Sequence, residues 1–194
     1  VFYSPKAGEM YPPVFSSHIE IKGLGDRLEG EFRPGFFKGV ATVVGKLFMQ
    51  VEPDKAFFGE KDFQQLLVVR KMVRDLNMGV EIVGVPCQRD ENGLALSSRN
   101  AYLSEDEKRI APELYRTLCR EAEAVAEGAS ITDVQKRAVR RLEQAGFGTI
   151  DYVAVCDAES LEPAKETSTS RPLRILAAAW LGRARLIDNV AIHQ

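Results

Sequence analysis

A strand–helix–strand pattern constrains the fold of this chain more than any other feature. Residues 55–58 form a short apolar run that ends at a glycine, as a buried parallel strand does. Residues 62–77 then carry apolar side chains at helical spacing, and Gly79 is the predicted stop of that helix. A second apolar run, residues 80–85, predicts another strand. Short connections between these elements predict a right-handed βαβ unit of a doubly wound sheet.

Two further elements are predicted upstream of that unit. Residues 36–51 form a predicted helix because their apolar side chains recur at helical spacing. These apolar positions are Val40, Val43, Val44, Leu47 and Val51. Residues 1–5 indicate the end of a buried strand that runs into a turn, so we expect the chain to begin inside a folded unit.

The pattern changes after Pro86. Ser104 and Glu107 form a capping-box sequence, which predicts the start of one long helix with an apolar stripe from Ile110 to Val125. A second amphipathic helix is predicted at residues 132–145. Three strand-like runs follow, at residues 152–156, 173–178 and 184–192. This order indicates an α+β domain with strands joined as hairpins, and a domain boundary near Pro86.

Composition excludes several classes of function. Apolar residues make up 45% of the chain and charged residues 28%, with a net charge of −2, which is the balance of a soluble globular protein. No basic stripe indicates nucleic-acid binding, and no apolar run is long enough to span a bilayer.

The cysteines and histidines give no metal or triad pattern. Cys87, Cys119 and Cys156 lack the spacing of a zinc site or a disulfide framework, so we interpret them as small buried hydrophobic residues. His18 and His193 have no acidic residue at a metal-binding spacing. Zinc and a Ser-His-Asp triad are therefore not expected, and the absence of a disulfide pattern is compatible with a reducing cytosol.

The first candidate for chemistry is the segment 57–65, at the carboxyl end of the predicted strand. Ligands of open α/β sheets bind at this position, where free N–H groups and the helix dipole favour anions. Gly59 lets a ligand approach the backbone, Lys61 suits phosphate, and Gln64 and Gln65 could reach a second substrate. In the alternative interpretation, Asp62 caps the helix and Lys61 is merely solvated.

The second candidate is the segment 96–100, which reads Leu-Ser-Ser-Arg-Asn. Paired hydroxyls followed by an arginine can bind phosphate oxygens, although an isolated match is more often a structural turn. The segment lies just past the predicted domain boundary, from where it could close over phosphates held at Lys61. The two segments together predict a nucleotide site with a lid.

These two segments also carry a resemblance to a known family. Residues 57–66 and 93–100 are similar to the paired signatures of pantothenate synthetases. Further similar stretches cover essentially the whole chain. They lie at residues 9–12, 28–30, 33–35, 39–44, 83–86 and 185–189.

The resemblance implies a fold and a reaction. Residues 1–86 would form the C-terminal half of a Rossmann-like nucleotidyltransferase domain, and residues 87–194 a smaller α+β lid domain. The family is cytoplasmic, usually forms homodimers through the former domain, and binds neither nucleic acid nor membranes. It activates pantoate with Mg-ATP as pantoyl-adenylate, releasing pyrophosphate. The amine of β-alanine then attacks, giving pantothenate and AMP.

The resemblance also implies roles for individual residues. Four residues of the first segment would contact ATP: Gly59, Glu60, Lys61 and Asp62. Gln65 would hold pantoate, and the methyl groups of pantoate would face Val40, Val43 and Val44. The carbonyl of Gln88 would meet the adenine, and the phosphates would lie against Leu96, Ser97, Ser98 and Arg99. The catalytic set would be Lys61, Ser97, Ser98 and Arg99, with no protein ligand for a metal.

Two features of the family lie outside these residues, namely its His-x-x-His motif and one pantoate-binding glutamine. Phe36 stands where the family commonly has histidine. We therefore expect little or no ligase activity from this polypeptide alone.

Two other hypotheses remain open. The chain could be a related adenylyl- or cytidylyltransferase that acts on another acid, although the matches at Gln64, Gln65, Val43 and Val44 speak against it. Alternatively, it could be a non-catalytic fragment that only folds, dimerises or weakly binds nucleotide, because a parallel sheet without its first strands exposes an apolar edge.

Overall fold

The computed structural model describes residues 2–167 and 170–193, and the chain divides into two compact units. The first unit comprises Val1–Phe58 and Gln64–Val85, and the second comprises Gly59–Phe63 and Pro86–Gln194. The short segment Gly59–Phe63 therefore belongs to the second unit, although both of its chain neighbours belong to the first. One sheet pairs β1 with β2 and a separate sheet has the order β3-β4-β5, which confirms the predicted α/β class.

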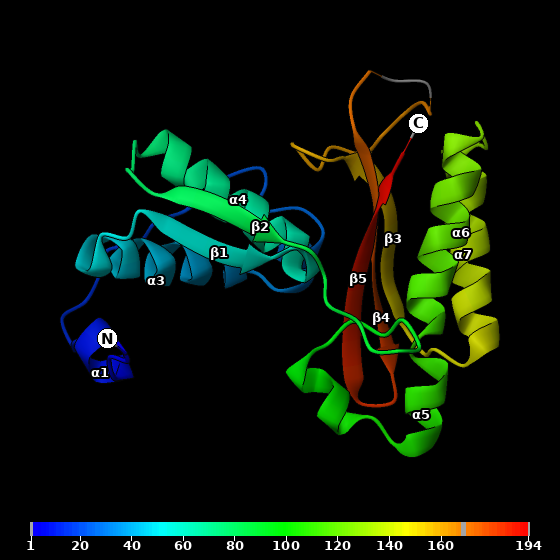
Figure 1. Cartoon of the computed structure of the whole chain (residues 1–194), viewed down its shortest axis with the longest axis horizontal. Coiled ribbons are helices and arrows are strands. Elements are labelled where there is room, and N and C mark those ends of the chain that lie inside the picture. The colour runs from blue at the N-terminus through cyan, green and yellow to red at the C-terminus, as the bar shows by residue number, and fades with distance from the viewer. Residues whose placement is uncertain (1, 168–169, 194) are drawn as a thin grey trace. The chain divides into compact units, whose positions relative to one another are not determined.

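Within its described residues, the first unit contains four α-helices and the two strands of the smaller sheet. Two one-turn helices, α1 (Ala7–Met10) and α2 (Glu29–Phe32), precede the long helix α3 (Phe36–Val51). The strand β1 (Lys55–Gly59), the helix α4 (Phe63–Asp75) and the strand β2 (Glu81–Val85) follow. The arrows of β1 and β2 point the same way in Figure 1, so this is the predicted parallel βαβ unit.

Small residues on α3 let the two long helices of this unit approach each other. Ala41 and Gly45 are buried one turn apart on α3. A Cβ built on Gly45 would lie 2.5 Å from Cδ1 of Ile19 and 3.5 Å from Sδ of Met72 on α4. Helical spacing with small residues on the packed face therefore explains why α3 forms despite its β-branched residues.

The predicted stop of α4 at Gly79 is wrong. The helix ends at Asp75, and Asn77 takes the left-handed conformation with a φ of 51°. The N–H of Met78 donates to the carbonyl of Val73 over 2.9 Å, and that of Asn77 to the carbonyl of Arg74 over 3.3 Å. These two bonds form a Schellman motif, and asparagine can occupy its left-handed position because its short polar side chain tolerates that backbone.

The predicted opening strand is also wrong for the residues that the structure describes. Residues 2–4 are exposed and form no strand, and 91% of Phe2 is exposed. The smaller sheet has the order β1-β2 and offers no paired neighbour to this segment. Tyr3 instead donates its hydroxyl to Oε1 of Gln50 over 2.9 Å. Val1 lies outside the described residues.

The second unit has two layers. The helices α5 (Glu105–Ile110), α6 (Glu113–Ala126) and α7 (Ile131–Ala145) precede the strands β3 (Ile150–Asp157), β4 (Leu173–Leu181) and β5 (Ala184–Ile192). The strands pair antiparallel, with Leu176 opposite Asn189 in the β4–β5 hairpin. The helices α6 and α7 lie side by side on one face of this sheet (Figure 1).

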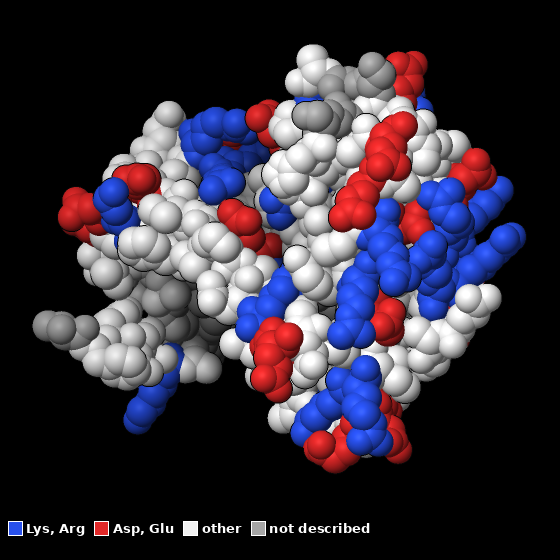
Figure 2. Space-filling model, turned by 45° about the vertical axis from the view of Figure 1, so that its right-hand side comes forward, with Lys and Arg blue, Asp and Glu red and all other residues white. Residues whose placement is uncertain are grey.

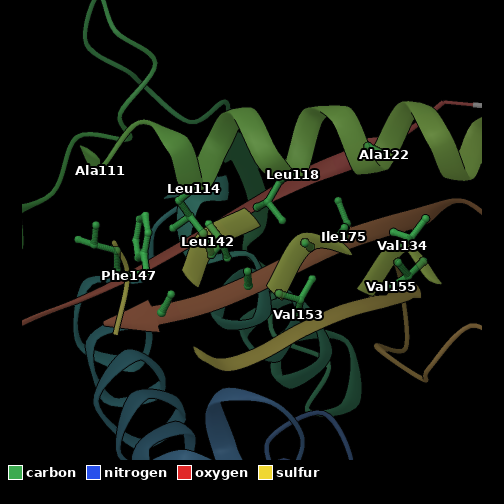
Figure 3. Packing of buried hydrophobic residues seen from close by; sticks show 14 of the residues in the cluster. Ala111, Leu114, Leu118, Ala122, Val134, Leu142, Phe147, Val153, Val155 and Ile175 are labelled. Atoms are coloured by element: carbon green, nitrogen blue, oxygen red, sulfur yellow. The ribbon is translucent and has the colours of Figure 1, made fainter. Parts of the chain in front are cut away.

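The core of the second unit lies between that helical layer and the sheet. Leu114 and Leu118 on α6 and Leu142 on α7 point toward Ile175 on β4 and Val155 on β3 (Figure 3). All five side chains are at most 2% exposed. Burying such aliphatic side chains contributes about 1.5–3 kcal/mol each, so this cluster is the main stabilising feature of the unit.

The predicted long helix after Ser104 is in fact two helices. The capping box is confirmed, since Ser104 Oγ accepts from the N–H of Glu107 and the Glu107 carboxylate accepts from the N–H of Ser104. The helix stops at Ile110, and α6 begins after Pro112. Proline has no N–H to donate and its ring clashes with the preceding turn, so the stripe from Ile110 to Val125 is divided between α5 and α6.

Charged side chains of both signs lie among each other on the face shown in Figure 2. On α6, the buried carboxylate of Glu121 pairs with Arg137 at 2.7 Å and with Arg141 at 3.3 Å, both on α7. These pairs join the two helices. Among the described helices, none is both long and apolar enough to cross a bilayer.

The end of β3 carries a testable pH dependence at Asp157. Its Oδ1 accepts from the N–H of Ser160 at 2.8 Å, the N–H of Glu159 at 3.0 Å and the Ser160 hydroxyl at 3.0 Å. Burial alone would raise the pKa of Asp157, but these donors hold it below its usual value. Because the folded pKa is depressed, the carboxylate stabilises the fold above the ordinary pKa of about 3.9, and this stability is lost as the pH falls through the folded pKa.

We therefore expect Asp157→Asn to lower the free energy of unfolding at pH 7, and the difference from the parent chain to shrink as the pH falls below about 4. Urea unfolding at pH 7 and at pH 3 measures both values. Asp133→Asn, at an exposed position on α7, is the matched control for the loss of one charge. A difference that stays constant across this pH range would contradict the role of the Asp157 carboxylate.

Candidate nucleotide site

The first candidate segment is a tight turn between β1 and α4. Gly59 ends β1, residues Glu60–Asp62 form a single turn of 3-10 helix, and Phe63 opens α4. Lys61 is half-buried and Asp62 is exposed. Within residues 2–167 and 170–193, the ammonium group of Lys61 has no side-chain partner, so it is available to a ligand.

A side chain far along the sequence holds this turn in place. The amide Nδ2 of Asn189, on β5, donates to the carbonyl of Glu60 at 2.9 Å and to that of Lys61 at 3.0 Å. Arg174, on β4, lies 3.9 Å from the Glu60 carboxylate and has its guanidinium 3.7 Å from the centroid of the Phe63 ring. The turn is thus anchored to the antiparallel sheet of its own unit.

The second candidate segment is also a turn of 3-10 helix, at Ser98–Tyr102. Ser97 caps it, since its Oγ accepts from the N–H of Arg99 over 3.2 Å. Arg99 donates Nη1 to the carbonyl of Arg185 over 3.1 Å. Leu96 and Ser98 are exposed, so the segment presents one free hydroxyl and a partly engaged guanidinium. The segment can therefore be a structural turn and bind a ligand as well, because the cap uses only the hydroxyl oxygen of Ser97.

The two segments meet at one small pocket in the second unit. Lys61 and Ser97 both line it, together with Asn100, Arg185 and Asp188. Among the described residues, the buried Oδ1 of Asn100 has no hydrogen-bond partner. Two segments 36 positions apart are thus brought to a common site by β5. Cationic and hydroxyl groups converge there, which is the chemistry that binds phosphate oxygens.

The loop that carries Gln88 runs beside this site. The carbonyl of Gln88 accepts from the N–H of Leu96 over 2.9 Å, next to a β-bridge between Arg89 and Ala95. The Cys87 thiol is a second, weak donor to this carbonyl, with its sulfur at 3.8 Å.

The cysteines fit the sequence interpretation only in part. Cys156 is buried, but Cys87 and Cys119 are half-buried. Burial raises the pKa of the Cys87 thiol despite the nearby Arg89, so this thiol stays protonated at neutral pH.

An ion pair fixes the loop that carries Gln88 to β5. Arg89 donates Nη1 and Nη2 to the two carboxylate oxygens of Asp188, at 2.6 and 2.8 Å, and also donates to the carbonyl of Gly93. Its guanidinium stacks 3.5 Å from the centroid of the Tyr115 ring. The side chain of Asp188 is 3% exposed and that of Arg89 is 16% exposed. This is a largely buried, bidentate pair, and the Gly93 carbonyl accepts a third hydrogen bond from the guanidinium.

The residues predicted for pantoate lie in the first unit, with one correction. Val40, Val43 and Val44 are half-buried along one face of α3, and Gln65 is half-buried on α4. Gln64 is 3% exposed, and its amide donates to the carbonyls of Leu24 and Arg27 at 2.6 and 2.7 Å. The expectation that Gln64 reaches a substrate is therefore wrong, because its hydrogen bonds are used to hold the loop before α2.

Sequence reasoning missed the residues that organise the site. No role was predicted for Arg89, Arg174, Asp188 and Asn189. Arg174 and Asn189 nevertheless hold the first candidate segment, and the Arg89–Asp188 pair holds the loop that carries Gln88. The signal was present at residues 188–189, where two polar residues interrupt an apolar strand. Within the described residues, no group of three or more His, Cys, Asp or Glu side chains could hold a metal ion.

Comparison with known proteins decides the family. The sequence model of the family described as pantoate-beta-alanine ligase matches residues 1–191. This chain belongs to the pantoate–β-alanine ligase family. The resemblance predicted from the two segments is therefore confirmed.

Individual members of the pantoate–β-alanine ligase family are similar over the whole chain. The pantothenate synthetase of Rhizorhabdus wittichii is 53% identical over 193 residues, covering 100% of this chain and 68% of that protein. The pantothenate synthetase of Caulobacter vibrioides is 51% identical over 197 residues, covering 99% of this chain and 68% of that protein. The chain thus spans about two thirds of the length of these relatives.

Solved structures of family members share the fold. The pantothenate synthetase of Thermus thermophilus matches with a TM-score of 0.90 and 45% identity, covering 98% of this chain and 68% of that one. The pantoate-β-alanine ligase of Francisella tularensis, complexed with beta-gamma ATP and β-alanine, matches with a TM-score of 0.74 and 29% identity. That match covers 96% of this chain and 62% of the other.

Proposed function

We propose that this chain contributes to the activity of its family, the ATP-dependent joining of pantoate to β-alanine. The expectation that this polypeptide alone has little or no ligase activity stays a prediction. The observation that carries the proposal is the convergence of Lys61 and Ser97 on one pocket, beside the capped turn that holds Arg99. The Francisella tularensis relative, solved with beta-gamma ATP and β-alanine, supports ATP as the nucleotide.

The first step of the reaction needs alignment and charge neutralisation more than a strong base. A carboxylate oxygen of pantoate attacks the α-phosphorus of ATP, the bond to the bridging oxygen breaks, and pyrophosphate leaves. Lys61 and Arg99 would neutralise the phosphate oxygens, and Ser97 and Ser98 would donate hydrogen bonds to them. Because these groups are held by β5 and by a cap, they need little reorganisation when the nucleotide binds.

The second step transfers the pantoyl group. The uncharged amine of β-alanine attacks the acyl carbon of pantoyl-adenylate, and AMP leaves with the electron pair of the broken bond. Gln65 would hold the hydroxyl groups of pantoate, and its methyl groups would lie against Val40, Val43 and Val44. Half-exposed valines along one helix face suit this apolar contact, because they remain accessible to a ligand.

The remaining ATP contacts follow from the two turns. Gly59, Glu60 and Asp62 would contact the nucleotide through the start of α4, where N–H groups and the helix dipole favour phosphate. The carbonyl of Gln88 would accept from the adenine amino group, and Leu96 would cover the base. Since the described residues form no metal cluster, Mg²⁺ would enter with the phosphates, as this ion commonly does in nucleotide sites.

We further propose that residues 1–86 act as the nucleotide- and pantoate-binding domain and residues 87–194 as a lid. Hinged closure over ATP suits a chain that divides into two compact units. A cytoplasmic homodimer is the assembly that the family resemblance supports. Sedimentation at micromolar concentration tests the dimer, and a single species with the mass of one chain would contradict it.

Binding experiments test the function. We expect calorimetry to detect ATP binding to the chain, and pantoate to bind the ATP complex at least about tenfold more tightly than other 2-hydroxy acids. Equal binding of all these acids would favour a nucleotidyltransferase with another substrate. Absence of ATP binding would contradict the proposed function for this chain.

A further inference from the structure

The contacts of Asn189 suggest a role that its position in the sequence does not reveal. Asn189 lies on β5 and is 7% exposed. Its Nδ2 donates both of its hydrogens to consecutive carbonyls, those of Glu60 and Lys61, at 2.9 and 3.0 Å. A side chain 128 positions away thus fixes the backbone on both sides of the Lys61 Cα.

The orientation of that amide is itself fixed. Nη1 of Arg174 donates to Oδ1 of Asn189, so the oxygen faces Arg174 and the nitrogen faces the turn. The backbone N–H of Asn189 donates to Oδ1 of Asp188 over 2.8 Å, and Asp188 is held by Arg89. Asn189 therefore sits in a network that leaves its amide one orientation.

Fixing these carbonyls also fixes the N–H groups of the turn. In a planar trans peptide, the carbonyl and the following N–H point in opposite directions. The carbonyl of Glu60 shares its peptide with the N–H of Lys61, and the carbonyl of Lys61 shares its peptide with the N–H of Asp62. Asn189 binds the two carbonyls, so both N–H groups are directed away from it, and N–H groups at the N-terminal end of a helix favour anions.

We infer that Asn189 is a positioning residue for phosphate binding, acting through the Lys61 and Asp62 peptides. This inference rests on the proposed function, because it assumes that the turn Gly59–Phe63 binds the phosphates of ATP. It adds to that function that a residue on β5, and not the sequence of the turn itself, fixes the orientation of the turn's peptides. Asn189 itself touches no reacting atom.

The substitution Asn189→Asp tests the inference. Aspartate has nearly the same shape and keeps an oxygen for Arg174, but it has no hydrogens to donate to the two carbonyls. We expect the dissociation constant of ATP to rise about tenfold, because two carbonyls lose their donor and the peptides can rotate. Adenosine lacks phosphates, so its affinity should change less than about twofold. Equilibrium titration with each ligand measures both constants.

Controls separate positioning from simpler effects. Gln144→Glu, at an exposed position on α7, adds the same charge elsewhere in the unit and should leave the ATP constant unchanged. Asn189→Ala also removes the donors but adds no charge, and it takes the place of Asn189→Asp if that variant does not fold by circular dichroism. We expect it to show the same selective loss for ATP over adenosine.

Each outcome decides between the inference and the function on which it rests. An unchanged ATP constant in Asn189→Asp, or a parallel loss of ATP and adenosine, would overturn the positioning role and leave the proposed function standing. A parent chain that binds no ATP would overturn both. Selective loss of ATP in both Asn189 variants, with Gln144→Glu unaffected, is the expected result.

Discussion

Replacing Lys61 by alanine should raise the dissociation constant of ATP by about 10- to 100-fold. A charge-assisted hydrogen bond to a phosphate contributes about 1.5–3 kcal/mol, and alanine removes both the charge and the donors. Lys61 lies on a turn whose backbone Asn189 holds in place, so the ammonium group reaches the pocket shared with Ser97 from a fixed point. Equilibrium titration with ATP at constant ionic strength measures the change.

The fold should not suffer from this change. The ammonium group of Lys61 makes no ion pair within the described residues, and its removal should alter the free energy of unfolding by less than about 0.5 kcal/mol. Lys136→Ala, at an exposed position on α7, is the matched control for the loss of one positive charge. If Lys61→Ala and Lys136→Ala weakened ATP binding equally, the effect would be general electrostatics and Lys61 would have no direct role.

Replacing Asp188 by alanine should lower the free energy of unfolding by about 3–5 kcal/mol. The carboxylate is the bidentate partner of Arg89, and its removal leaves a guanidinium that is 16% exposed without its counter-charge. The loop that carries Gln88 would lose its anchor at the same time. Urea unfolding of the variant and of the parent chain measures the difference.

Two variants show whether the cost comes from the uncompensated charge. The double substitution Arg89→Ala with Asp188→Ala should destabilise the chain by less than the sum of the two single substitutions, because no lone charge remains. Asp188→Asn keeps the shape and one accepting oxygen, so its cost should lie between those of the parent and of Asp188→Ala. If the double substitution lowered the free energy of unfolding by the sum of the two single effects, the interaction between Arg89 and Asp188 would contribute nothing to stability.

Local pattern was enough to predict most elements of the fold. The helix at residues 36–51 and the strand that begins at Lys55 follow from apolar spacing, and the capping box at Ser104 follows from two residues three positions apart. These features depend on contacts within a few residues, which a linear sequence displays directly. The family could also be recognised, because its two signature segments are contiguous stretches of chain.

The predictions from sequence were wrong where the property of a single residue overrode the pattern of its neighbours. The helix after Ser104 breaks at Pro112, although the apolar stripe continues across the break. Asn77 ends α4 in place of the expected Gly79, because asparagine can also adopt a left-handed backbone. Gln64 resembled a ligand-binding residue, yet burial commits its amide to two backbone carbonyls.

By itself, the sequence determined the element types, the family and the two segments that carry Lys61 and Ser97. Only the tertiary structure decided that these segments share one pocket and that β5 holds them there. Asn189 and Asp188 act across more than 90 positions of chain, on Lys61 and on Arg89. Such pairings depend on how β4 and β5 fold beside the turn, and hydrogen bonds between distant residues leave no periodic signal in the sequence.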